Sequence, residues 1–367
     1  MKIAMITDHL LSGGKERRMV ELMKALSINP KYVFHIIILE GKDEKSIAYK
    51  DIFKFPVRII YLGCYSRKQL AWQIYKLCRN ERYDVLHLWA ALIYGYILAP
   101  THYVLHIPII SSSITSARLQ GGNKFWLNKL TYHFYDKILS NSVQALVINE
   151  VPKDKAICIY NGFDPKRSIV KTPSDEIRCR YNICTKYIVS MAGEYSKRKD
   201  YPLFVSAANR VLNQCPEVTF LAMGSGDSSP YKSLILPSYN DRIRFVGRVS
   251  DVESVFNASD VVVLATMVEG VSNAIMEGMS LGKPIVSTKG PYVGTPEIVE
   301  DNHSGILVNY HDDKAFADAI LRLLQDEQLR KSMGAKGREI VMEKFGIQQM
   351  TNSFAQIYNC YANKTYR

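Results

Sequence analysis

Short apolar runs rich in β-branched residues alternate with longer amphipathic stretches along most of this chain, and no other feature constrains its fold as strongly. The strand-like runs of the first half lie at 2–7, 33–39, 57–62, 84–89, 107–111 and 145–149. The pattern restarts after residue 185, with runs at 186–193, 217–224, 242–247, 260–265, 283–288 and 304–308. Helical stretches such as 15–26 and 66–78 separate the runs. This alternation is typical of βαβ units and predicts an α/β fold with parallel sheets.

The chain is long enough for two such domains, because its 367 residues exceed what one hydrophobic core usually supports. The polar stretch 161–177 contains two prolines and is the best linker, so domains are expected at 1–165 and 178–345. The segment 346–367 has an apolar stripe and is expected to be a helix that packs on the first domain. Two doubly wound domains facing each other would form a central cleft, and ligands of such sheets bind at the carboxyl ends of the strands.

The charge balance points to a negatively charged partner. Lys and Arg exceed Asp and Glu by 12. Such an excess suits nucleic acid, an anionic membrane surface or phosphorylated small molecules. The chain has no block of five or six basic residues of the kind that marks a nucleic-acid arm, so nucleic acid is not an expected partner.

Cysteine use and hydropathy favour a cytoplasmic location. The seven cysteines are scattered without paired CxxC motifs, so free thiols in a reducing compartment are expected rather than a zinc site. The N-terminal stretch 1–10 is too short and too quickly polar for a signal peptide, and is expected to begin with a strand. No apolar run reaches the roughly 20 residues that span a bilayer. The nearest approach, at 91–100, is expected to be a buried helix.

Two glutamates with seven residues between them define the most informative local segment. Glu269 is expected in the loop after the strand-like run 260–267, and Glu277 inside a helix that Ser272 or Asn273 caps and that ends near residue 280. The free N–H groups of such a helix start form an anion site. We expect the carboxylates to lie roughly 8–12 Å apart. This spacing suits an extended ligand such as a nucleotide-sugar, although a capped amphipathic helix with incidental acids fits equally well.

The segment EGVSNAIMEGMSLGKPIVST resembles the E-x7-E motif of the retaining glycosyltransferases of family four, which have the two-domain GT-B fold. The resemblance covers most of the chain in order and spacing, through GGKERRMVELMKAL, IYNGFD, MGSGD, RFVGRVSDVESVFNASDVVVLAT and GTPEIVEDNHSGILV. It implies that 1–165 is the acceptor-side domain and that 178–345 binds a nucleotide-sugar. The implied activity transfers a hexose or N-acetylhexosamine, expected to be UDP-linked, to a glycan acceptor. That acceptor is expected to be lipid-linked, in the biosynthesis of cell-surface polysaccharide such as O-antigen or capsule.

The resemblance also implies roles for particular residues. Glu277 would hold the ribose hydroxyls and Glu269 the hexose hydroxyls, with Glu269 and Lys199 as the catalytic pair. The other residues implied to bind the donor are Gly13, Gly14, Arg198, Gly224, Gly226, Arg248, Val249, Gly270, Val271, Ser272 and Asn273. At 13–14, glycine would let the backbone approach a diphosphate closely, although a tight turn would explain the same residues.

One departure from the family pattern lies in the phosphate-binding segment. Lys199 matches the lysine of the family's G-R-x-x-x-x-K pattern, but Glu194 occupies the arginine position. A carboxylate there would repel a diphosphate. Either this side chain points away, or Arg198 or another cation takes over the missing role.

A second departure concerns a histidine that the family often carries and that the stretch 107–118 lacks. In the family the leaving diphosphate is thought to take the acceptor's proton, so no protein base is strictly required. The resemblance leaves His87, Ser112, Ser113 and Arg118 as candidate contacts of the sugar or the acceptor. For His87, a structural role on its strand is the alternative.

No metal or other cofactor is expected. The chain has no Asp-x-Asp motif at a strand end, and 311–313 is expected to cap the helix that follows. Lysine, backbone N–H groups and helix dipoles would neutralise the diphosphate instead.

The stretch 121–139 interleaves aromatic residues with Lys124, Lys129, His133 and Lys137. A basic amphipathic helix can lie in an anionic membrane interface, which would make the protein peripheral on the inner face of the cell membrane. The alternative is a helix whose aromatic side packs on the sheet of its own domain.

Two further functions stay open at this point. A nucleotide-sugar epimerase would use the same fold. A non-catalytic member that only binds a sugar nucleotide would account for Glu194 and for the missing histidine.

Overall fold

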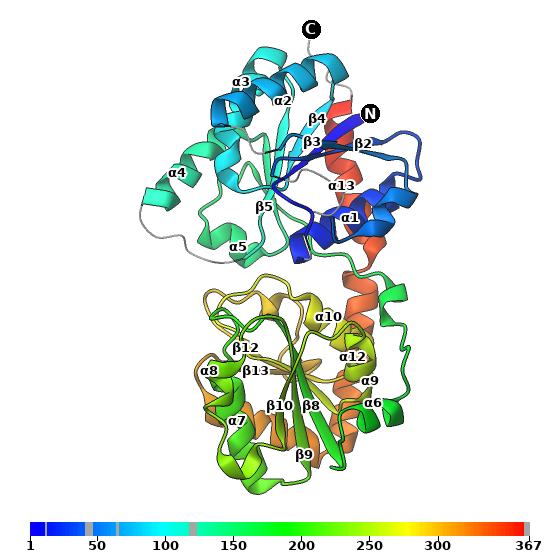
Figure 1. Ribbon diagram of the computed structural model, residues 1–367, viewed down its shortest axis with the longest axis vertical. Coiled ribbons are helices and arrows are strands. Elements are labelled where there is room, and N and C mark those ends of the chain that lie inside the picture. The colour runs from blue at the N-terminus through cyan, green and yellow to red at the C-terminus, as the bar shows by residue number, and fades with distance from the viewer. Residues whose placement is uncertain (12, 41–46, 64–65, 117–122, 363–367) are drawn as a thin grey trace. The chain divides into compact units, whose positions relative to one another are not determined.

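The computed structural model describes residues 1–11, 13–40, 47–63, 66–116 and 123–362 (Figure 1). It divides the chain into two compact units. The first unit is Met1–Gly162 together with Ile347–Arg367, and the second unit is Phe163–Gly346. Most of the stretch predicted as a linker therefore belongs to the second unit.

The first unit contains a seven-stranded parallel sheet in the order β3-β2-β1-β4-β5-β6-β7. Its strands are β1 (Lys2–Thr7), β2 (Val33–Ile38), β3 (Val57–Tyr61), β4 (Val85–Leu88), β5 (Ile109–Ile114), β6 (Lys137–Ser140) and β7 (Ala156–Cys158). The direction of winding reverses between β1 and β4, where doubly wound sheets bind ligands.

Helices cover this sheet. They are α1 (Gly14–Leu26), η2 (Lys50–Lys54), α2 (Arg67–Glu81), η3 (Leu92–Tyr94), α3 (Gly95–Leu105), α4 (Asn123–Thr131), η4 (Tyr132–Phe134), α5 (Val143–Ile148) and α13 (Ile347–Ala362). The C-terminal helix α13 lies beside α1, as Figure 1 shows in red and blue, and inserts Phe354 and Tyr358 into the core of the first unit.

Two sequence predictions in this unit are wrong. The run 145–149 lies mostly in α5, not in a strand, because the Ser142 hydroxyl accepts a hydrogen bond from the Ala145 N–H at 3.1 Å and caps a helix. The helix predicted over 121–139 ends at Thr131, and the sixth strand, β6, follows it. Short apolar runs carry too little periodicity to separate a buried strand from a buried helix.

The second unit contains a six-stranded parallel sheet in the order β10-β9-β8-β11-β12-β13. Its strands are β8 (Tyr187–Ala192), β9 (Val218–Met223), β10 (Ile243–Gly247), β11 (Val261–Leu264), β12 (Ile285–Lys289) and β13 (Gly305–Asn309). All six predicted runs are confirmed as strands, and five of them are largely buried, while the edge strand β10 is mostly half-buried. The winding reverses between β8 and β11.

The helices of the second unit are η5 (Pro165–Ser168), α6 (Ser174–Arg180), α7 (Tyr201–Gln214), α8 (Ser229–Lys232), η6 (Pro237–Tyr239), α9 (Val252–Ala258), α10 (Asn273–Ser280), η7 (Thr295–Glu297), α11 (Asp313–Gln325) and α12 (Glu327–Lys344). Asp312 caps α11 as the sequence predicts, since its side chain accepts from the Ala315 N–H at 2.9 Å. The doubly wound α/β architecture is thus present in both units. Among the described residues, none of the helices combines the length and apolarity that crossing a membrane requires.

Candidate active site

Opposite charges meet at the carboxyl edge of the second sheet, at its switch point. Lys199 lies between β8 and α7, and Glu269 lies in the loop between β11 and α10. The Lys199 ammonium donates to Glu269 Oε2, and Lys199 also forms an isolated antiparallel bridge with Thr266. Because β8 and β11 are neighbouring strands, two residues 70 positions apart in sequence form one ion pair.

The loop that carries Glu269 is fixed by backbone hydrogen bonds. Its N–H donates to the Tyr292 carbonyl, and its own carbonyl accepts from the Gly294 N–H, each at 3.0 Å. The loop after β11 is thereby tied to the loop after β12. This pairing holds the Glu269 carboxylate at the sheet edge before any ligand binds.

Helix α10 begins where the sequence predicts, with Ser272 as its N-cap. Ser272 has extended backbone geometry, and within the described residues its side chain makes no capping hydrogen bond. The N–H groups at the start of α10 are therefore not satisfied by a cap side chain and remain suited to an anion. Gly270 and Val271 lie in the loop just before, and Asn273 is the first residue of the helix.

Glu277 is buried inside α10 and pairs with a residue that sequence reasoning missed. Its Oε1 accepts from Nη2 of Arg167, which belongs to η5. The signal that could have found Arg167 is its place just after the IYNGFD segment, which the family resemblance already marked. The two glutamates of the motif are thus each held by a cation.

The glycines after β9 have a packing reason. A Cβ on Gly224 would lie 1.9 Å from the Gly193 carbonyl oxygen, so only glycine fits where these two loops meet. Gly226 has a backbone φ of +107°, which residues other than glycine rarely adopt. Tyr195 joins the same loops, because its N–H donates to the Ser225 carbonyl at 2.7 Å. The glycines therefore shape the strand ends beside Lys199.

Glu194, the departure from the family pattern, forms an ion pair with Arg198. Arg198 Nη2 lies 3.0 Å from Glu194 Oε2, and both side chains are about half exposed. An exposed pair of this kind contributes little to stability. Its local effect is to neutralise the carboxylate that would otherwise repel a diphosphate.

Arg248 and Val249, two further residues expected to bind the donor, follow the edge strand β10. Arg248 is exposed and Val249 is half-buried.

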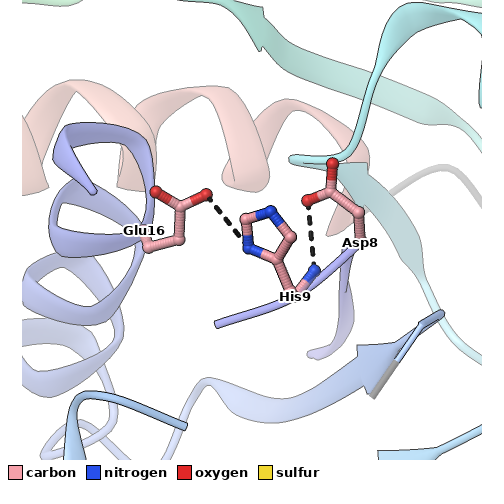
Figure 2. Close-up of side chains that lie close together, drawn as sticks. All are labelled: Asp8, His9 and Glu16. Atoms are coloured by element: carbon pink, nitrogen blue, oxygen red, sulfur yellow. Dashed lines mark hydrogen bonds and ion pairs between the residues drawn. The ribbon is translucent and has the colours of Figure 1, made fainter. Parts of the chain in front are cut away.

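In the first unit, a polar cluster surrounds the start of α1 (Figure 2). Ligand atoms of Asp8, His9 and Glu16 lie within 4.8 Å of one another, a grouping that could hold a metal ion. The Lys15 ammonium, however, lies 3.1 Å from Asp8 Oδ1 and 3.4 Å from Glu16 Oε1, so it already pairs with both carboxylates. His9 Nδ1 lies 3.9 Å from Glu16 Oε1.

Gly13 and Gly14 begin α1, and Glu16 occupies the space beside them. Gly13 is the N-cap with extended backbone, and a Cβ there would lie 2.2 Å from Glu16 Oε2. The first helix N-terminus therefore faces a carboxylate of its own chain. This placement agrees with the affinity of helix N-termini for negative charge.

His87 and Ser112 were expected as candidate contacts of the sugar or the acceptor, and the structure places both in the core instead. Both are fully buried, and His87 bonds through Nδ1 to the Tyr358 hydroxyl at 2.7 Å and through Nε2 to Ser112 Oγ at 2.8 Å. Both ring nitrogens are thus satisfied inside the core, and burial holds the pKa of His87 well below its ordinary value. Ser113 is half-buried and donates to the Ala90 carbonyl. Arg118 lies outside the described residues.

The basic stretch proposed to contact a membrane is divided between α4 and β6. Lys137 lies in β6 and donates to the Asp154 carbonyl, and Lys129 pairs with Glu150. The exposed side chains of α4 are instead mostly apolar. Trp126, Leu127 and Leu130 are each about half exposed or more.

The chain matches two family models. One, described as glycosyltransferase family 4, covers residues 12–167, and one described as glycosyl transferases group 1 covers residues 186–326. Together they span most of both units.

Curated relatives share about a quarter of their residues with the chain. N-acetyl-alpha-D-glucosaminyl L-malate synthase of Bacillus anthracis is 24% identical over 303 residues, covering 79% of this chain and 78% of the relative. A GalNAc-alpha-(1->4)-GalNAc-alpha-(1->3)-diNAcBac-PP-undecaprenol alpha-1,4-N-acetyl-D-galactosaminyltransferase of Campylobacter jejuni is 25% identical over 344 residues, covering 91% of each chain. A UDP-Gal:alpha-D-GlcNAc-diphosphoundecaprenol alpha-1,3-galactosyltransferase of Escherichia coli is 23% identical over 309 residues, covering 78% and 77%.

Solved structures share the fold. A glycosyltransferase from Rickettsia africae has a TM-score of 0.83 and 20% identity, covering 99% of both chains. Anabaena Alr3699/HepE in complex with UDP-glucose has a TM-score of 0.80 and 17% identity, covering 98% of this chain and all of that one.

Proposed function

From the premise that this chain belongs to glycosyltransferase family 4, and is therefore a retaining glycosyltransferase of the GT-B fold, we propose that it uses a UDP-sugar. The transferred group is a hexose or N-acetylhexosamine, and the acceptor is a lipid-linked glycan of cell-surface polysaccharide biosynthesis. The observation that carries this proposal is the arrangement of Lys199, Glu269 and Glu277 around the uncapped start of α10. Relatives that act on diphosphoundecaprenol-linked acceptors support the acceptor class.

Each group of the site has a task that its chemistry suits. Glu277 accepts hydrogen bonds from the ribose hydroxyls, and Glu269 accepts from hydroxyls of the sugar. The first amides of α10 and the Lys199 ammonium bind the diphosphate. An ammonium has three donors, so Lys199 can hold Glu269 and a phosphate oxygen together.

The transfer itself needs no protein base. The bond between the anomeric carbon and the diphosphate oxygen breaks, and a bond to the acceptor hydroxyl forms on the same face of the sugar. The departing diphosphate oxygen takes the acceptor's proton. Cationic and N–H donors stabilise the charge that develops on the diphosphate, and we propose that no metal is needed.

The direct test supplies a panel of UDP-sugars with and without an undecaprenyl-diphosphate-linked glycan. We expect UDP release and a heavier lipid product by mass spectrometry only when both substrates are present. Conversion of the donor into its epimer without an acceptor would favour the epimerase. Nucleotide binding with neither product nor slow donor hydrolysis would favour a non-catalytic member.

We also propose that the first unit docks on an anionic membrane, where such an acceptor resides. This unit carries 24 Lys and Arg against 12 Asp and Glu, which gives +12. The second unit carries 23 against 23, which gives zero. The whole net charge of the chain therefore belongs to the first unit. Basic residues near an anionic leaflet each contribute about 1 kcal/mol to binding.

Helix α2 offers a specific surface for this docking. Lys68, Trp72, Lys76 and Arg79 recur at helical spacing and are all exposed, with Trp72 63% exposed. Among the described residues, none of these three cations pairs with a carboxylate. Cations around an exposed tryptophan are typical of surfaces that bind membrane interfaces.

A further inference from the structure

We propose that Arg167 is the positioning residue for Glu277, and that this pair sets the affinity for the ribose. The proposal rests on the proposed function, because it assumes that Glu277 binds the ribose hydroxyls. It assigns a role to a residue of η5 that lies 110 positions before its partner.

The pair is nearly closed to water. The Arg167 side chain is 16% exposed and the Glu277 side chain is 9% exposed. Moving a carboxylate this far from water is costly unless a partner compensates for the lost solvation. Arg167 supplies that partner at Glu277 Oε1.

Arg167 also sets the orientation of the Glu277 carboxylate. Its Nη2 donates to Glu277 Oε1. A planar guanidinium fixes the plane of a carboxylate more tightly than an ammonium does, because its donors form a rigid fork. The direction in which Glu277 accepts hydrogen bonds from the ribose hydroxyls then depends on this pair.

Arg167 is itself held in place by the segment around it. Its guanidinium lies 5.0 Å from the centre of the Phe163 ring, a cation–π distance. The next residue, Ser168, bonds through Oγ to Ser280 Oγ at 2.9 Å, at the end of α10. Asp164 caps η5 by accepting from the Lys166 N–H at 3.0 Å.

The residues just before η5 are also held in place by a hydrogen bond. The Phe163 N–H donates to the Phe345 carbonyl at 2.7 Å. Thus η5 is fixed to α10 through Ser168 and to the end of α12 through Phe163. A turn fixed at both ends can set the position of a side chain between them, as positioning requires.

The test measures binding of UDP and of 2′,3′-dideoxy-UDP to Arg167→Gln, Arg167→Lys and Glu277→Gln variants by calorimetry. Lys166→Gln, an exposed neighbour in the same turn, is the matched control. We expect Arg167→Gln to weaken UDP binding about tenfold and dideoxy-UDP binding less than twofold. Arg167→Lys should recover part of the loss, and Arg167→Gln should add little in the Glu277→Gln background, because both changes remove the same interaction.

Several results would overturn the proposal. If Glu277→Gln weakens UDP binding but Arg167→Gln and Arg167→Lys do not, positioning is wrong while the proposed function stands. If Arg167→Gln weakens both nucleotides equally, Arg167 acts on the phosphates or on folding. If Glu277→Gln leaves UDP binding unchanged, the ribose role fails, and the donor site of the proposed function fails with it.

Discussion

The two units have the same doubly wound architecture, yet they differ in where they put their charge. The first unit carries the whole net charge of +12, while the second is neutral. The second unit nevertheless holds the two glutamates of the motif in ion pairs, Lys199–Glu269 and Arg167–Glu277. A neutral domain with local ion pairs suits a small, directional ligand, and a strongly positive one suits an extended anionic surface.

The polar groups of the two switch points differ as well. His87 lies in β4, one of the two strands at the first unit's reversal, and both of its ring nitrogens bond to core partners, Tyr358 and Ser112. Lys199 and Glu269, at the second unit's reversal, have side chains that are 10% and 21% exposed, whereas His87 is fully buried. The same topology therefore supports a structural hydrogen-bond chain in one unit and a candidate catalytic site in the other, which is why function has to be argued from the site.

The largest effect should come from removing the cation at the second switch point. Lys199→Met deletes a donor to the leaving diphosphate and leaves Glu269 without its partner. We expect kcat to fall about 10²–10³-fold, the loss typical of one transition-state donor. Steady-state UDP release measures this, with the exposed Lys197→Met as the control. Equal rates for both variants would contradict the assignment.

Neutralising the α2 surface should show most clearly that the two units have different tasks, because it should weaken vesicle binding without changing UDP affinity. Changing Lys68, Lys76 and Arg79 together to Gln removes about 3 kcal/mol of attraction to an anionic leaflet, or roughly 100-fold in partitioning. Sedimentation with phosphatidylglycerol vesicles at low salt measures this. UDP affinity should not change.

The matched control for the α2 surface lies in the neutral unit, where Lys171, Lys232 and Lys314 are exposed. Their joint change to Gln should leave vesicle binding nearly intact. If the two triple variants lose binding equally, net charge matters and the α2 surface does not. If neither loses binding, the exposed α4 residues Trp126 and Leu130 are the next candidates.

A smaller effect is expected from the second glutamate of the motif. Glu277→Gln weakens two charge-assisted hydrogen bonds to the ribose, so UDP affinity should fall at least tenfold. Calorimetric titration of UDP measures the change, with the exposed Glu217→Gln as the control. An unchanged dissociation constant would show that the ribose binds elsewhere.

Acid should destabilise the first unit through His87. Burial lowers the pKa of this ring, so below about pH 6.5 the unfolded chain takes up a proton that the folded chain does not. The free energy of unfolding should thus fall as pH drops, by up to about 1.4 kcal/mol per unit. His35, with a pKa also lowered by burial, adds to this trend.

Tryptophan fluorescence can follow that unfolding selectively, because all three tryptophans belong to the first unit. Urea titrations between pH 7.5 and 5 should show a shallower pH dependence for His87→Gln than for the unchanged chain. Identical slopes would mean that His87 does not account for the acid sensitivity.

The smallest effect should come from chelation. If lysine and helix N–H groups neutralise the diphosphate, transfer in excess EDTA should equal transfer without it. A loss restored by Mg²⁺ or Mn²⁺ would contradict this, and the Asp8, His9 and Glu16 cluster would then deserve mutation (Figure 2).

Local patterns in the sequence determined much of the second unit. Its six strands, the Ser272 N-cap of α10 and the Asp312 cap of α11 all follow from residues within a few positions of each other. Hydrophobic periodicity and helix capping depend on residues close together in the chain, so both can be predicted from the sequence alone. The same reasoning failed at 145–149, where the run was too short for its period to distinguish a helix.

Tertiary structure alone decided the partners of the site. Arg167 meets Glu277 across 110 residues, Lys199 meets Glu269 across 70, and His87 meets Tyr358 across 271. The sequence marked both glutamates and left His87 open between a ligand contact and a structural role. Which cation reaches which carboxylate depends on strand order and on where the chain returns to pack. Those contacts form only when the strands and helices have packed into the complete domain, and no local sequence pattern encodes them.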